Sequence, residues 1–183
     1  MHFRFRAAVA AGLVSIASFV SGCGWHQISA QTPSHFLSQN PTQKTVVLHL
    51  YAAENGNNND MNFNGYGNGS MTVTIPMGWH VKVDFVNTDN SQVHSAMIVP
   101  LRDHNLPLIT TAMLAFPKAS TPFPNQGTNQ GVHQSFHFTA SKAGRYAIVC
   151  GIATHAEMGM WDRLVISATA ARASMRMPVS PSS

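Results

Sequence analysis

A cysteine, a histidine and a methionine follow one another at equal spacing in the last third of the chain. Cys150 ends an apolar run, His155 comes five residues later, and Met160 five residues after that. A second histidine, His94, stands upstream at the start of another apolar run. One thiolate, two imidazoles and a weak axial thioether are the ligands of a type 1 copper ion. Soft sulphur favours Cu(I) and imidazole serves both oxidation states, so the pattern predicts one-electron transfer at one copper ion.

Each of these residues also has a less specific explanation. A cysteine at a strand end is usually a small buried hydrophobic residue. Met158 is an alternative to Met160 as the axial ligand, because the length of a weak axial bond is hard to fix from spacing. Trp161 is expected to pack beneath the loop, and Glu157 to be solvated. The remaining histidines are expected on solvated faces: His26, His35, His49, His80, His104, His133 and His137.

The elements that must position these ligands are strands. The body of the chain consists of short apolar runs rich in β-branched residues, separated by clusters of Gly, Asn, Pro and Asp, a pattern typical of antiparallel strands. Val81, Val83 and Phe85 alternate with Lys82 and Asp84, so one face of this strand is expected to lie in the core and the other to be exposed to solvent. The predicted fold class is all-β, a two-sheet Greek-key β-sandwich of about seven or eight strands. The runs are Thr45–Tyr51, Ser70–Ile75, His80–Asn87, His94–Val99, Gln134–Thr139, Arg145–Cys150 and Arg163–Ser167.

Two segments interrupt the strands. Glu54–Gly69 is rich in Asn and Gly, which tolerate left-handed backbone conformations and suit tight reversals. Leu101–Gly131 contains four prolines and is long for a connection in one domain, so we expect it to be functional or to carry local structure. A short helical turn is expected at Thr110–Phe116.

The N-terminal segment has the layout of an export signal. Arg4 and Arg6 precede the apolar run Ala7–Val20, which is too short for a stable membrane span and ends in Val-Ser-Gly-Cys. This ending resembles a bacterial lipobox, in which the cysteine, here Cys23, is acylated. The alternative is ordinary signal cleavage nearby, which would leave Cys23 a free thiol, or an apolar segment that is not processed and itself serves as the anchor. The expected organisation is a lipoprotein signal peptide at 1–22, a lipidated tether at 23–43, the folded domain at 44–169 and a flexible tail at 170–183.

The charge of the chain argues against a nucleic-acid partner. The 183 residues contain only 10% charged side chains and a net charge of +4, with no run of Lys or Arg. Without residues 1–22, which hold two of the 11 basic residues and none of the seven acidic ones, the balance is +2. Few carboxylates also mean little stability lost when carboxylates are protonated, which suits an acidic environment.

These motifs resemble the cupredoxins, and within them the sulfocyanins most closely, with rusticyanin a more distant relative. The resemblance is carried by Cys150-Gly151-Ile152, His155-Ala156-Glu157 and Gly159-Met160-Trp161, and upstream by Asn62–Gly65, Gly69-Ser70 and Thr72–Trp79. It implies a cupredoxin fold and one type 1 copper ion held by His94, Cys150, His155 and Met160, and it favours Met160 over Met158. The chain departs from many blue copper proteins at Ser95, where an Asn often ties the two ligand loops together.

The resemblance also implies a function. We expect a monomeric electron carrier and not an enzyme, because a copper enzyme such as a nitrite reductase needs a second copper ion and a second domain. The expected partner is a c-type cytochrome or a terminal oxidase at the outer, periplasmic face of a membrane, in an acidophile's respiratory chain. Docking is expected around His155, with Ala153, Met158 and Met97 as its apolar neighbours. Copper delivery, weakly suggested by Met175 and Met177, is the alternative.

Overall fold

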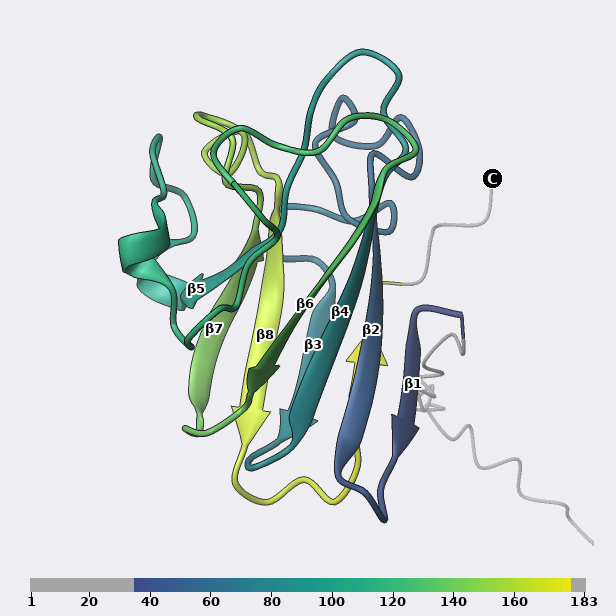
Figure 1. Cartoon of the computed structure of the whole chain (residues 1–183), viewed down its shortest axis with the longest axis vertical. Coiled ribbons are helices and arrows are strands. Elements are labelled where there is room, and N and C mark those ends of the chain that lie inside the picture. Colours follow the sequence, from purple (N-terminus) through teal and green to yellow (C-terminus); the bar gives the residue numbers. More distant parts are fainter. Residues whose placement is uncertain (1–34, 179–183) are drawn as a thin grey trace, which may run out of the picture.

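The structure is a computed structural model that describes residues 35–178, and these form two β-sheets packed face to face (Figure 1). The first sheet has the order β1-β2-β4-β6, with β1 Leu37–Asn40, β2 Thr45–Ala52, β4 His80–Asn87 and β6 His133–Thr139. The second has the order β5-β7-β8-β3-β9, with β5 Met97–Pro100, β7 Gly144–Val149, β8 Trp161–Ser167, β3 Thr72–Pro76 and β9 Ser174–Arg176. The predicted all-β sandwich is confirmed. The pairs β2·β4 and β3·β8 are parallel, whereas all others are antiparallel.

The two strands that the sequence patterns did not predict are edge strands. β1 lies within the expected tether and β9 within the expected tail, so the fold extends beyond the expected boundaries 44 and 169. Each is too short to show a period, because only Leu37 in β1 and only Met175 in β9 are buried. The side chain of Gln39 joins the two edges, donating to the carbonyl of Ala173 and accepting from its amide, both at 2.9 Å. The expected signal peptide and Cys23 lie outside the described residues.

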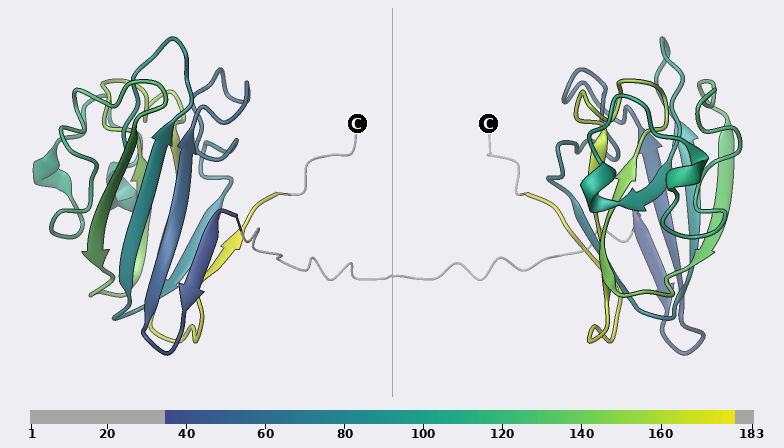
Figure 2. Two further views of the ribbon diagram at one scale, coloured as in Figure 1. Left: turned by 45° about the vertical axis from the view of Figure 1, so that its right-hand side comes forward. Right: turned by 90° about the vertical axis from the view of Figure 1, so that its left-hand side faces the viewer.

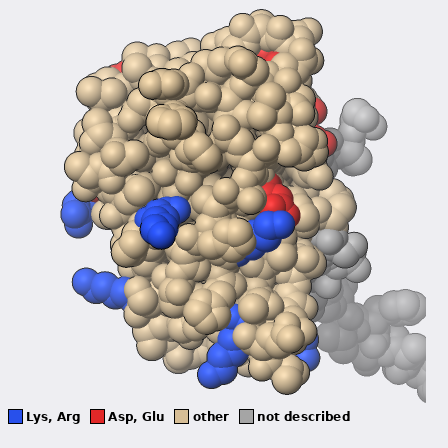
Figure 3. Space-filling view, in the orientation of Figure 1, with Lys and Arg blue, Asp and Glu red and all other residues tan. Residues whose placement is uncertain are grey.

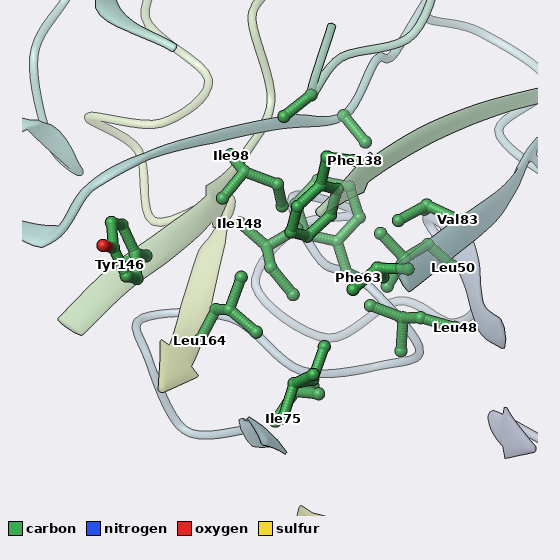
Figure 4. Close-up of a cluster of buried hydrophobic side chains, with 14 of the residues drawn as sticks. Leu48, Leu50, Phe63, Ile75, Val83, Ile98, Phe138, Tyr146, Ile148 and Leu164 are labelled. Atoms are coloured by element: carbon green, nitrogen blue, oxygen red, sulfur yellow. The ribbon is translucent and has the colours of Figure 1, made fainter. Parts of the chain in front are cut away.

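Alternating burial along the strands builds the core between the sheets. In β4, Val81, Val83 and Phe85 are buried, as their alternation predicts. Figure 4 shows such side chains from both sheets meeting, among them Leu50 and Ile148. Fully burying a side chain of this size stabilises the fold by about 1.5–3 kcal/mol. The core thus holds the strand ends, and the loops on them, in fixed positions.

The long connection after β5 carries two 3₁₀ helices, η1 Leu101–Asp103 and η2 Thr111–Met113, the second inside the expected helical turn. Figure 2 shows this segment lying outside the edge strand β5. Phe116 anchors it to the core by stacking on Phe138 at 5.1 Å between ring centroids. No helix within residues 35–178 is long and apolar enough to cross a membrane.

The sandwich has two different ends. Segments 53–71, 88–96, 120–132 and 150–160 lie at the end toward which β2, β4 and β7 run, which is the upper end in Figure 1. We call it the ligand end, because it carries all four residues predicted to bind the metal. The turns 41–44, 77–79, 140–143 and 168–173 lie at the opposite end, which we call the distal end.

Candidate metal centre

Three of the predicted ligands meet at the ligand end. Sγ of Cys150 lies 3.9 Å from Nδ1 of His94 and 3.6 Å from Nδ1 of His155, and all three residues are buried. An ion about 2.0 Å from nitrogen and about 2.3 Å from sulphur would hold such atoms roughly 3.7 Å apart in a trigonal plane. The three side chains therefore fit one metal ion. Within residues 35–178 no other group of three His, Cys, Asp or Glu side chains is spaced in this way.

Met160 lies inside the fold and Met158 on its surface. The side chain of Met160 is fully buried, whereas that of Met158 is 52% exposed. The backbone of Met160 closes the ligand loop, because its carbonyl accepts from the amide of Cys150 at 3.1 Å and its amide donates to the carbonyl of His155 at 2.9 Å. Burial beside two of the ligands favours Met160 as the axial ligand.

Asp89, which the sequence analysis did not single out, orients His94. Its Oδ2 lies 2.9 Å from Nε2 of His94, and both side chains are buried. Its Oδ1 accepts from the amide and hydroxyl of Ser91, each at 2.7 Å, and from the amide of Gln92. The only signal available in the sequence was an Asp five residues before a candidate ligand, in a turn-forming run.

The two pKa values at this contact describe a carboxylate beside a neutral imidazole. Burial raises the pKa of Asp89, but hydrogen bonds from His94 and Ser91 outweigh it and bring the pKa to about 2. Burial lowers the pKa of His94 despite the carboxylate next to it. The proton of His94 therefore stays on Nε2, which donates a hydrogen bond to Asp89. The lone pair of Nδ1 then points toward Cys150, the orientation that a metal ion requires.

Ser95 links the two ligand loops at Cys150. Its hydroxyl accepts from the amide of Gly151 at 2.8 Å, and its own amide donates to Sγ of Cys150 at 3.4 Å. The serine thus provides the link expected of an Asn at this position. A side chain at Gly151 would collide with Sδ of Met97, which would lie 2.6 Å from its Cβ. Burial raises the pKa of the Cys150 thiol, so a metal ion must displace its proton.

The Asn-rich loop braces the ligand loop from outside. The side-chain amide of Asn58 donates to the carbonyl of Met158 at 3.1 Å, and the backbone amide of Asn68 donates to the carbonyl of Gly159 at 2.8 Å. Gly159 has a φ of +97°, and a Cβ there would lie 2.4 Å from Oδ1 of Asn68. These contacts give the loop, which the sequence analysis treated as a set of tight reversals, a structural role at the metal centre.

His155 is the ligand nearest to the surface, with 7% of its area exposed. Burial and the neighbouring His94 lower the pKa of His155 to about 4. Around it Ala153 and Met158 are exposed, as expected, but Met97 is fully buried, because it packs beneath Gly151 in the second core cluster.

Two apolar side chains of the long connection are also exposed at 57% and 74%, Leu108 and Phe123. The amide of Thr154 donates to the carbonyl of Pro107 at 2.8 Å, and the side chain of Asn125 donates to the carbonyl of Gly151 at 2.7 Å. These bonds join the long connection to the ligand loop.

The remaining predicted residues have simpler surroundings. Glu157 is exposed, as expected. Trp161, expected to pack beneath the loop, is only half-buried; its ring contacts the ring of His104, at 3.9 Å between centroids, and the guanidinium of Arg163, at 5.6 Å. Of the other histidines assigned to the surface, His35, His80, His133 and His137 are exposed, His49 is half-buried and His26 lies outside the described residues.

Comparison with known proteins agrees with this geometry. The family model for the sulfocyanin (SoxE) domain matches residues 32–174. Sulfocyanin from Sulfolobus acidocaldarius is 31% identical over 141 residues, covering 69% of this chain and 65% of the relative, so the match spans just under two thirds of that protein.

Solved structures share the fold. Auracyanin A, a "blue" copper protein from the green photosynthetic bacterium Chloroflexus aurantiacus, matches with a TM-score of 0.50 at 18% identity, over 67% of this chain and 99% of its own. Rusticyanin variants match with a TM-score of 0.50 at 25% identity, over 68% of this chain and 78% of theirs. With a family match over most of its length and a buried His₂Cys cluster at the expected positions, the chain belongs to the sulfocyanin family of cupredoxins.

Proposed function

We propose that the chain is a type 1 blue copper protein that carries single electrons. The observation that supports this most directly is the convergence of Cys150, His94 and His155 in one buried cluster. The copper ion would be held by these three residues and by Met160, and when bound it would supply the Cu(II)/Cu(I) couple. Four protein ligands leave no open position for a substrate, so the proposed role is that of a carrier and not of an enzyme.

The surroundings of the ligands suit fast electron transfer. Asp89 fixes His94, Ser95 fixes the start of the ligand loop, and the Asn-rich loop braces its end. Ligands held in this way move little when the charge of the ion changes. A small rearrangement lowers the barrier to electron transfer.

Electrons would enter and leave through His155. It is the ligand nearest the surface, and Ala153, Met158, Leu108 and Phe123 give its loop and the adjoining connection exposed apolar side chains. A surface with few charges suits brief contact with another redox protein, because transient redox complexes have small interfaces. The proposed partner is a c-type cytochrome or a terminal oxidase of a respiratory chain.

The proposed location is the outer face of a membrane, with Cys23 acylated as the anchor. The support is the N-terminal pattern of two arginines, an apolar run and Val-Ser-Gly-Cys. Replacement Cys23→Ser in the producing cell is expected to move the protein from the membrane fraction to the soluble extracytoplasmic fraction. A protein whose fractionation is unchanged by this replacement would contradict lipid anchoring.

Optical spectroscopy tests the copper site, and the second cysteine supplies the control. The copper-loaded protein is expected to show an intense visible thiolate-to-copper charge-transfer band. Cys150→Ser abolishes the band, because it removes the thiolate, whereas Cys23→Ser leaves it unchanged. A colourless copper complex of the unaltered chain would overturn the proposal.

Copper delivery, the alternative function, gains no support from the C-terminal methionines. Met175 is fully buried in β9 and Met177 is half-buried against the core. Neither is presented on the surface as a thioether for collecting copper.

A further inference from the structure

The two ends of the molecule carry charged side chains of opposite sign. The four segments of the ligand end contain no Lys or Arg, and their carboxylates are Glu54, Asp60, Asp89 and Glu157. The four turns of the distal end contain no Asp or Glu, and their cations are Lys44, Lys142 and Arg172. Figure 3 shows the blue Lys and Arg atoms mostly over the lower half of the molecule and the red Asp and Glu atoms over the upper half.

The three distal cations stand on three separate turns. Lys44 follows β1, Lys142 follows β6 and Arg172 follows β8, and all three are exposed. None of their side chains makes an ion pair or a hydrogen bond within residues 35–178. Their full charge therefore faces solvent.

Neighbouring residues add to this charge and do not cancel it. The exposed Arg145 lies one residue inside β7, close to the turn of Lys142. The carboxylate nearest to this end along the first sheet, Asp84, is engaged by Lys82 at 2.8 Å. The distal end is consequently a uniformly cationic surface.

We propose that the distal end docks on an anionic phospholipid bilayer. Separated cations suit a fluid layer of anionic headgroups, because the lipids can diffuse until one lies beneath each cation. A folded protein partner would instead need acidic side chains at positions that match those of the three cations. Each Lys or Arg near such a surface strengthens binding by about fivefold. Met77, 47% exposed in the turn before β4, adds an apolar contact for the interface. Trp79, the aromatic residue of these turns, is buried, so the aromatic anchor of a typical protein interface is missing from them.

This contact would orient the metal centre. The eight residues of β4 span roughly 26 Å between the two ends. With the distal end on the bilayer, the ligand end would point away from it, and the carboxylates of the ligand end would be repelled from the same surface. The docking depends neither on copper nor on the acylation of Cys23. A lipid anchor would strengthen it by keeping the domain close to the membrane.

Vesicle flotation tests the binding. A chain that begins at residue 24 avoids the signal and Cys23, and it retains both sheets and the whole described core, which lie in residues 35–178. We expect it to float with vesicles of phosphatidylglycerol and phosphatidylcholine at low ionic strength, to be released as salt is raised, and not to bind pure phosphatidylcholine. Circular dichroism verifies folding independently of copper, so a failed blue-copper assignment would not be mistaken for failed docking.

Two triple variants of equal charge separate location from net charge. Lys44→Glu/Lys142→Glu/Arg172→Glu is expected to reduce vesicle binding by at least a hundredfold. The control makes the same exchange at exposed cations outside the distal turns: Arg102→Glu, Lys118→Glu and Arg176→Glu. It is expected to bind at least tenfold more tightly than the distal variant. Equal losses in the two variants, or no binding by the parent chain, would overturn the proposal.

Fluorescence quenching tests the orientation. Met77→Trp places a reporter at the distal end, and Met158→Trp places one at the ligand end, both at exposed positions. With brominated lipids in the vesicles, the added emission of the first variant is expected to be quenched and that of the second unaffected, after the parent signal is subtracted. Stronger quenching at position 158 would show the reverse orientation and overturn the proposal.

Discussion

The carboxylate of Asp89 and the imidazole of His94 face each other at 2.9 Å in the interior of the ligand end. The contact places a negative charge on the far side of the His94 ring from the expected metal position, and it fixes which imidazole nitrogen carries the proton. Carboxylate partners of this kind make a histidine a stronger ligand. Asp89 is itself fixed by Ser91 and by the side chain of Asn87, which accepts from the Asp89 amide at 2.9 Å. The orientation of His94 is therefore set before the metal binds.

Replacement Asp89→Asn should weaken Cu(II) binding by about 10- to 100-fold, the usual effect of removing an outer partner of a ligand. The lost negative charge stabilised Cu(II) more than Cu(I), so the reduction potential should rise, by about 59 mV for each tenfold change in relative affinity. Competition against a chelator and voltammetry measure the two effects. Glu157→Gln, which removes an exposed carboxylate from the ligand loop, is the control for net charge. Equal shifts in both variants would contradict a specific role for Asp89.

Copper affinity should depend on pH mainly through Cys150. Burial raises the pKa of its thiol, so binding must release that proton throughout the acidic and neutral range. The pKa of His155 is lowered to about 4 and that of His94 is also lowered, so neither imidazole competes for protons at neutral pH. Near pH 7, binding should release about one proton per ion, so the affinity should fall about tenfold for each unit by which the pH is lowered.

Below about pH 4 the dependence should become steeper, because His155 must then lose a proton as well. Two ordinary histidines, with pKa values near 6.5, would instead steepen the curve already near pH 6. Calorimetry in two buffers of different ionisation enthalpy counts the released protons. A release close to three protons per ion at pH 5 would disprove this account.

Asp162 should make the fold more stable as the pH falls toward 4. Its Oδ1 accepts from the amide of Met71 at 2.8 Å, but its Oδ2 is buried without a partner. Burial raises the pKa of this carboxyl well above its usual 3.8. The folded protein therefore retains a proton that the unfolded chain loses, and this contribution to stability is full below about pH 4 and declines as the pH rises.

Asp162→Asn keeps an acceptor for Met71 and removes the titration. The unfolding free energy of the parent, minus that of the variant, should increase from pH 7 to pH 4. Denaturant unfolding of the copper-free protein measures it without interference from the pH dependence of copper binding. The same titration of Glu157→Gln controls for the loss of one charge. A difference that is constant with pH would contradict the assigned ionisation.

The strands that could be predicted from sequence were those with a long alternating pattern. Val81, Val83 and Phe85 placed β4 with its observed bounds, because burial on one face of a strand has a period of two. The edge strands could not be predicted, since each is short and buries only one side chain, Leu37 in β1 and Met175 in β9. A single buried residue shows no alternation in the sequence.

The same distinction applies to the metal centre. Cys150 and His155 could be identified because residue type and spacing determine a ligand loop, whereas the choice of Met160 over Met158 depended on the family resemblance. Asp89 could not, because its role depends on how the turn after β4 folds back on His94. The bond from the amide of Gly151 to the hydroxyl of Ser95 follows from the packing of two loops, since the two residues are 56 positions apart in sequence. Chemistry carried by one segment was predictable, whereas support that comes from a second segment required the structure.

The identity of the axial ligand is open to a direct comparison of two methionines. Met160→Leu preserves size and apolar character at a fully buried position but removes the thioether. Although the thioether is a soft ligand, losing the electron pair of an axial donor costs the more highly charged Cu(II) more than Cu(I). The reduction potential should therefore rise, by about 59 mV for each tenfold loss of Cu(II) affinity relative to Cu(I). The charge-transfer band should change in position or relative intensity.

Met158→Leu makes the same exchange at a position that is 52% exposed, so it should leave the spectrum and the potential close to those of the parent. Because both variants retain an apolar side chain of similar volume, a difference between them reports coordination and not packing. If Met158→Leu shifted the potential and Met160→Leu did not, the axial ligand would be Met158. The ligand loop would then have to open, since Gly159, at φ +97°, and the bond from Asn58 to the carbonyl of Met158 together hold that residue in its present place.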